Sequence, residues 1–322
     1  MLGESFFHSF PRDRNLRTLD HSLRILRSVL EFGLLLVPEI VKYPPELRDP
    51  GDEKDKIVNV QRRLSMTMLP VERLPEHCEH FGPVSLGFSP LAARHLGAMP
   101  VMYLPQGTTG GSGGTLDQLG YFFSYRIAEL HQVCDRIINL RKTLGQHKSL
   151  DVLKIENRSR VEEVEIDNRS LKTLLDMIIG PNSVEEFAAV LQALSSLFYP
   201  TDEFRYSVEL VRNPLYYYFQ REWRILSGLV LDGKEVDLPL TPQEKAMVSC
   251  SNPYFFNGII SLRHQQIRRV DACTIVRAIE GRPVRELVES VYVPAKWLQA
   301  TKELLDEFSM GSRVRLVNID CD

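Results

Sequence analysis

The stretch that most constrains the fold is Leu215–Leu226, with the sequence LYYYFQREWRIL, which is typical of one long strand carrying charge in its middle. Strand side chains alternate between two faces, so one face collects apolar residues, namely Tyr217, Phe219, Trp223 and Ile225. The other face then carries Glu222, together with Tyr216, Tyr218, Gln220 and Arg224. Because desolvating an unpaired carboxylate is costly, Glu222 either pairs with an arginine or lines a cleft, where it contacts a sugar hydroxyl or a developing cation. The pattern alone leaves both readings open.

Composition places the chain among ordinary globular proteins. Its 322 residues can bury one large core or two modest ones, and a net charge of -3 with a pI near 6.3 gives no global basic field for nucleic acid. The five cysteines are scattered without a CxxC pair, which favours free thiols in a reducing compartment. The first residues, MLGESFFHSF, lack a signal-peptide pattern, and the longest nearby apolar run is too short for a bilayer. We therefore expect a cytoplasmic protein with no membrane partner.

The first hundred residues are predicted to mix strands and helices. A strand-like Phe6–Phe10 precedes leucines at helical spacing, which run from Leu16 to Leu30 with Gly33 at the helix end. The segment Leu34–Lys56 is rich in Pro, Glu and Asp and is expected to be irregular. Strands are then predicted at Arg63–Leu69, Val84–Phe88 and Val101–Leu104, with a short helix at Leu74–Phe81.

The middle of the chain is predicted to be a mostly helical insertion, residues 107–200. It opens with the glycine-rich loop 107–115, which lacks both P-loop and dinucleotide fingerprints and is expected to be a flexible linker or lid. A hairpin or an exposed strand is expected within Leu150–Ser170, and a helix at Ser183–Phe198. Residues 1–106 and 201–322 would then form a split α+β core with a bent mixed or antiparallel sheet. Its later parts are strand-like segments and one helix, at Phe255–Leu262, Ala272–Ala278, Arg285–Val291, Ala295–Phe308 and Arg313–Asn318.

Common catalytic signatures do not occur in the sequence. His77 and His80 flank Cys78, but no second Cys/His pair lies at a useful spacing, so no metal site is predicted. No GxSxG turn and no cysteine in a signature context supports nucleophilic hydrolysis.

One combination of residues resembles the DarT-like ADP-ribosyltransferases. FFHSF followed by ILRSVLEFGLLL is similar to the His-containing strand and Gly-Leu helix end of that branch, and Gln220-Arg221-Glu222 is similar to its Q-x-E catalytic strand. The resemblance implies an ADP-ribosyltransferase-like sheet and NAD as substrate. It also implies that His8 binds the NAD ribose and that Arg62 or Arg63 holds the diphosphate. Glu222 would bind the nicotinamide-ribose hydroxyl, with Gln220 and Tyr218 beside it. A fixed carboxylate near developing positive charge provides electrostatic catalysis.

A second resemblance covers more of the chain. RRLSMTMLPVERLPEHCEHFGPVSLGF, LGAMPVMYLP and FQREWRIL are together similar to the bacterial AbiGi-like abortive phage resistance family. That resemblance implies the antitoxin half of a two-gene phage-defence system, with a cognate toxin or antitoxin as partner.

Two hypotheses follow for the function. The chain is either an NAD-using effector that modifies a nucleic-acid or protein target, or a catalytically inactive antitoxin or regulatory binding protein. An enzyme needs His8, an arginine and Glu222 around one open cleft. In a binding protein, Glu222 can pair internally with Arg224 or Arg63.

Overall fold

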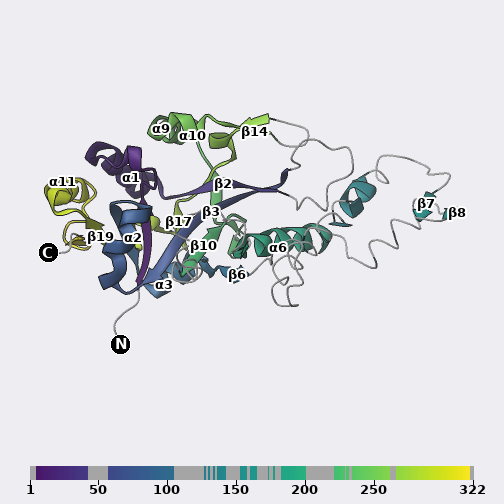
Figure 1. Ribbon diagram of the computed structural model, residues 1–322, viewed down its shortest axis with the longest axis horizontal. Helices are drawn as coiled ribbons and strands as arrows, with labels where there is room; N and C mark the ends of the chain where they lie inside the picture. The colour runs from purple at the N-terminus through teal and green to yellow at the C-terminus, as the bar shows by residue number, and fades with distance from the viewer. Residues whose placement is uncertain are drawn as a thin grey trace, which may run out of the picture.

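A computed structural model describes most of the two predicted core segments and parts of the sequence between them (Figure 1). The residues that it describes are 5–42, 57–104, 127, 130, 133–134, 136–142, 153–157, 160–164, 173, 177, 183–200, 221–228, 230–231, 234–261 and 266–319. The glycine-rich loop 107–115 lies outside them. In the described part, no helix is both long and apolar enough to cross a membrane.

The centre of the fold is a ten-stranded mixed sheet, so the molecule combines α and β structure as predicted. The order is β13-β16-β2-β3-β1-β4-β19-β20, while β10 pairs with β3 and β5 off this path. Neighbouring strands are antiparallel except β19 and β20, which are parallel. The strand bounds are β1 Ser5–Phe10, β2 Leu34–Lys42, β3 Ile57–Leu69, β4 Val84–Phe88, β5 Met99–Pro100, β10 Glu222–Leu226, β13 Asp237–Pro239, β16 Thr274–Val276, β19 Val288–Val293 and β20 Arg315–Asn318.

Helices cover this sheet and anchor it through apolar side chains. Their bounds are α1 Leu19–Phe32, α2 Leu74–Phe81, α3 Pro90–His95, α6 Ser183–Leu197, α9 Pro242–Ser251, α10 Pro253–Phe256 and α11 Leu298–Glu307. The largest core joins α1, α3 and α11 to strand residues such as Leu64, Met66 and Ile225. A smaller core places α2 against Phe7 and Tyr292 on the opposite face of the sheet. The two cores hold both faces of the central strands in place.

Several local predictions are confirmed. Thr18 caps α1, which begins at Leu19 after a turn of 3-10 helix and ends at Gly33. The helix at Leu74–Phe81 and the strand at Val84–Phe88 have the predicted bounds. The charged segment near residue 160 forms an antiparallel hairpin, β7 Leu153–Asn157 with β8 Arg160–Val164.

Two local predictions are wrong. Leu34–Lys42 is the strand β2 and not an irregular segment, because its apolar residues pair with β3 and β16 on its two edges. Phe255–Leu262 begins in the helix α10, since the Asn252 side chain accepts a hydrogen bond from Phe255 N at 3.1 Å and Pro253 favours a first helical turn. Of the strand predicted over Leu215–Leu226, the described part is β10, which begins at Glu222 after Arg221 with its left-handed φ of 42°, and residues 215–220 lie outside the described residues.

The ends of the predicted insertion lie side by side. β6 (Met102–Leu104) pairs in parallel with β9 (Phe198–Pro200), so the segments at the two predicted ends of the insertion are neighbours. The helix α6 precedes β9 and lies against β3 and β10 (Figure 1). Part of the predicted insertion thus touches the strands that carry the candidate site.

Candidate functional site

The sheet divides along one edge of β3. Thr67 pairs with Phe7 of β1, and Arg63 pairs with Val37 of β2. Both β3 residues pair with β10 on their other side, so β1 and β2 lie along the same edge of β3, one after the other. Between these two pairings, residues 64–66 of β3 lie next to neither strand, whereas on the other edge they pair with β10. The two neighbouring strands therefore separate beside Ser65.

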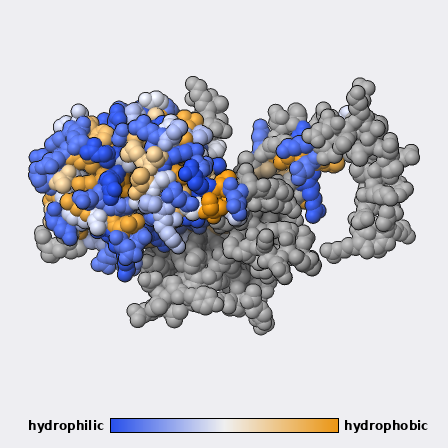
Figure 2. Space-filling view, turned by 90° about the horizontal axis from the view of Figure 1, so that it is seen from above, coloured by the Kyte–Doolittle hydropathy of each residue, from blue (hydrophilic) through white to orange (hydrophobic). Residues whose placement is uncertain are grey.

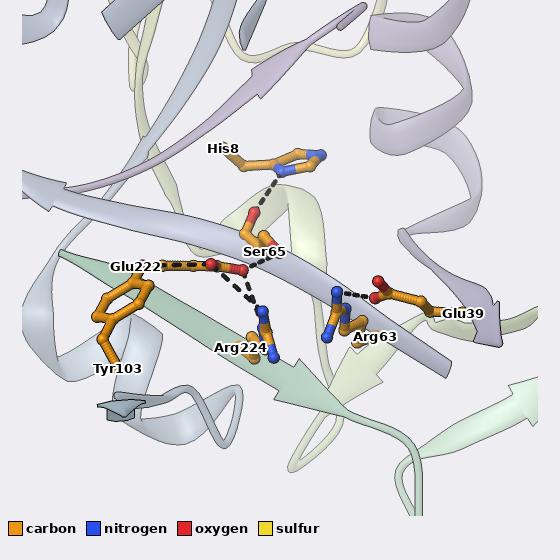
Figure 3. Close-up of polar contacts among 7 residues, drawn as sticks. All are labelled: His8, Glu39, Arg63, Ser65, Tyr103, Glu222 and Arg224. Atoms are coloured by element: carbon orange, nitrogen blue, oxygen red, sulfur yellow. Dashed lines mark hydrogen bonds and ion pairs between the residues drawn. The ribbon is translucent and has the colours of Figure 1, made fainter. Parts of the chain in front are cut away.

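Glu222 is held on the other edge of β3 by hydrogen bonds (Figure 3). Its Oε1 accepts a hydrogen bond from Ser65 Oγ at 2.7 Å and another from Arg224 Nε at 2.9 Å. Its Oε2 lies 3.4 Å from both Tyr103 Oη and Arg224 Nη2, each of which donates to it. The contacts come from three separate strands, and the carboxylate is fixed in position by them.

Strand register explains why these groups meet. Thr67 lies directly opposite both Phe7 and Glu222, and directly opposed residues place their side chains on one face of a sheet. Ser65 and Arg224 are also directly opposed, two positions away on the same face. Trp223 and Ile225 then point the other way, toward the largest core, as the alternation of the sequence predicted.

The electrostatics of Glu222 are dominated by its arginine partner. Burial by itself raises the pKa of Glu222, but the charge and hydrogen bond of Arg224, the Ser65 hydroxyl and the charge of Arg63 together leave it below its usual range. Arg224 is only 1% exposed, and the Glu222 side chain is 15% exposed. Burial and the nearby Glu222 charge raise the pKa of Tyr103, which keeps its hydroxyl protonated and able to donate. The site therefore holds an ionised carboxylate.

His8 reaches the same serine by a different atom. Its Nδ1 lies 2.9 Å from Ser65 O, the carbonyl on the edge of β3 where β1 and β2 separate. Figure 3 shows His8 and Glu222 on either side of β3, with Ser65 between them. Burial lowers the pKa of His8, and the bond to Ser65 only partly opposes that effect. His8 and Glu222 are thus connected through Ser65 rather than by direct contact.

The two predicted arginines point in different directions. Arg63 forms an ion pair with Glu39 of β2, and its charge acts on Glu222 (Figure 3). Arg62 donates from Nε to the carbonyl of Ala272, on the opposite face. Adjacent strand residues project to opposite faces, so the structure brings Arg63 to the site and places Arg62 elsewhere. Tyr218 and Gln220 lie outside the described residues.

Another histidine near β1, His77, packs against an aromatic ring. His77 stacks on Phe81 with ring centroids 4.4 Å apart, and burial lowers its pKa to about 4. Within the described residues, no group of three or more His, Cys, Asp or Glu side chains could hold a metal ion.

Ser65 and Tyr103 are the site residues that sequence reasoning missed. Ser65 lies in the predicted alternation of Arg63, Ser65 and Thr67, so pairing this strand with the Glu222 strand could have suggested it. Tyr103 gave no such signal, because its approach to Glu222 depends on β5 pairing with β10 just before it.

No family model, no curated protein and no solved structure matches the chain.

Proposed function

We propose that the protein is an ADP-ribosyltransferase-like effector of bacterial anti-phage defence that uses NAD as substrate. The observation that carries the proposal is the fixed, ionised Glu222 beside the place where the sheet divides. Cleavage of the nicotinamide bond builds positive charge on the ribose, and a carboxylate held beforehand in one orientation stabilises that charge. The division of the mixed sheet at Ser65 supports an ADP-ribosyltransferase-like shape.

The proposed roles follow the contacts. Ser65 and Arg224 would orient Glu222, and Tyr103 would complete its hydrogen bonding. Glu222 would bind a ribose hydroxyl and face the developing cation. Arg63, whose charge lowers the pKa of Glu222, would attract the NAD diphosphate. His8 would contact the ribose from the far side of Ser65.

The ion pair between Glu222 and Arg224 favours a second function, a catalytically inactive antitoxin or regulatory binding protein. A buried guanidinium 2.9 Å from the carboxylate cancels much of the field that the carboxylate would exert on a substrate. In such a protein the pair would stabilise the sheet, and the partner would be a cognate toxin or antitoxin.

The deciding experiment uses Glu222→Gln, which keeps the size of the side chain and removes its charge. Purified wild type and variant are incubated with labelled NAD and candidate protein and nucleic-acid targets, and release of nicotinamide and transfer of label are measured. If Glu222 stabilises a cationic transition state, the rate falls by about 10²-fold or more. Glu76→Gln is the matched control, because the Glu76 side chain is exposed and forms a surface ion pair with Arg73 at 3.5 Å.

The NAD assay separates the two functions, and thermal melts of the same samples show whether each variant is folded. The enzyme function predicts lost turnover in a variant that still folds. A wild-type protein that neither binds nor consumes NAD, together with a destabilised Glu222→Gln variant, contradicts it and supports the binding function.

A further inference from the structure

A second surface lies away from the Glu222 site, on a small hairpin that stands outside the main sheet. The hairpin consists of β14 (Ile259–Ser261) and β15 (Gln266–Arg268), and among the described strands these two pair only with each other. Gly258 O accepts a hydrogen bond from Arg269 N at 2.8 Å, which continues the pairing into the 3-10 helix η5 (Arg269–Ala272). The hairpin is therefore anchored at one end by η5 and the adjoining α10.

Apolar side chains are exposed on this hairpin and on α10. Tyr254 is 96% exposed and Ile259 is 56% exposed, while the alternate residue Ile260 is fully buried. Exposed aromatic and aliphatic side chains that gather on one part of a surface are typical of binding surfaces. Figure 2 views the molecule from the side on which α9, α10 and β14 lie, and shows hydrophobic and hydrophilic residues side by side there.

Cationic side chains lie on the hairpin, on η5 and on the helix α9. Arg268 lies directly opposite Ile259 in the hairpin register, so the two side chains share the exposed face. Arg268 Nε and Lys245 Nζ of α9 each lie 2.9 Å from an oxygen of Asp271. Arg269 lies over the Phe255 ring, 4.1 Å from its centroid, and within the described part of the chain its buried Nε has no hydrogen-bond partner. Two cations thus share the carboxylate of Asp271, and Arg269 adds a third positive charge two residues before it, in a chain whose net charge is -3.

We propose that this surface, defined by Tyr254, Ile259, Arg268 and Lys245, docks an extended acidic segment of a partner protein. The positive charge of the surface favours an acidic partner, and the exposed apolar residues favour one that also carries apolar side chains. Because β14 and β15 pair only with each other among the described strands, the outer edge of the hairpin offers backbone N–H and C=O groups to an extended polypeptide. A nucleic acid would match the cations but would use neither Ile259 nor the backbone edge.

The test measures fluorescence anisotropy of the full-length protein with three labelled probes. They are a synthetic peptide alternating glutamate and leucine, a peptide of the same charge alternating glutamate and serine, and an oligothymidylate of equal length. The glutamate–leucine peptide is expected to bind tightest. Tyr254→Ser and Ile259→Ser are expected to raise its Kd about tenfold, as truncating a central interface residue does. Arg268→Gln is expected to weaken binding mainly at low salt.

Two matched controls lie elsewhere on the surface. Leu91→Ser removes an exposed leucine from α3, and Lys302→Glu changes an exposed lysine of α11, so both should leave the Kd unchanged. Thermal melts check that every variant folds. Oligothymidylate binding equal to or tighter than the peptide would assign the surface to nucleic acid and overturn the proposal. Absence of saturable peptide binding, or equal binding of the glutamate–serine peptide, would overturn it as well.

Discussion

Replacing Arg224 by methionine tests the central charge arrangement most directly. Methionine fills much of the volume of the arginine stem but removes the charge that faces Glu222. Removing one partner of a buried ion pair typically costs about 3–5 kcal/mol, because the other charge is left uncompensated. Glu222 keeps its bonds from Ser65 and Tyr103 and is 15% exposed, so we expect the lower end of that range, about 3 kcal/mol.

The pH dependence of stability supplies an independent sign. In the wild type, the lowered pKa of Glu222 contributes stability that is present above the unfolded pKa and is lost as the pH falls through the folded value. In Arg224→Met, burial is no longer opposed by the arginine charge, so the pKa of Glu222 rises and protonation relieves the buried charge. The stability difference between the two proteins should therefore be largest near neutral pH and shrink in the acidic range.

Urea denaturation followed by tryptophan fluorescence measures both effects across a pH series. The double variant Glu222→Gln with Arg224→Met completes a thermodynamic cycle that isolates the pairwise term. A loss below about 1 kcal/mol at neutral pH would refute the reasoning, since surface ion pairs contribute no more than that. A stability difference that does not change with pH would refute it equally.

Two further substitutions test the packing around the site. Trp223→Ala should lower the free energy of unfolding, measured by urea denaturation, by about 2–3 kcal/mol. This loss is smaller than for a fully buried tryptophan, because Trp223 is only partly buried, although its ring packs edge-on against Phe6 with centroids 5.0 Å apart. A loss below about 1 kcal/mol would place this face of β10 outside the core. Gly87→Ala should lower the melting temperature clearly, since a Cβ at this position would lie 2.2 Å from Ser290 Oγ. Gly281→Ala is the control, because a Cβ there meets open space and the variant tests only the cost of the positive φ of 78°.

Alternation along the late strand was the most informative sequence signal. It placed Trp223 and Ile225 in the core and Glu222 with Arg224 on the other face, and the register with β3 confirms that division. The prediction holds because a short run of period-two residues is fixed by burial of one face.

The predictions that failed depend on contacts between distant residues. Pro38 and the nearby acidic residues favoured an irregular segment, but pairing on both edges of β2 overrode that local preference. The division of the sheet at Ser65 depends on where β1 ends its pairing and β2 begins, which no local pattern encodes. For the same reason the sequence could not show that Arg62 and Arg63 face different parts of the molecule.

Stability alone does not account for an ion pair at this place. Replacing a buried pair by apolar residues of similar volume is often neutral or stabilising, so a strand needs no Glu222 and Arg224 in order to hold its position. The opposite face of β10 already provides that anchor through Ile225 and the partly buried Trp223. Glu222 is ionised, is fixed by Ser65 and Arg224, and is partly exposed to solvent, so its carboxylate is oriented for contact with a bound molecule. This orientation, beside the separation of β1 and β2, is the reason to test Glu222 for binding or catalysis before treating it as a purely structural residue.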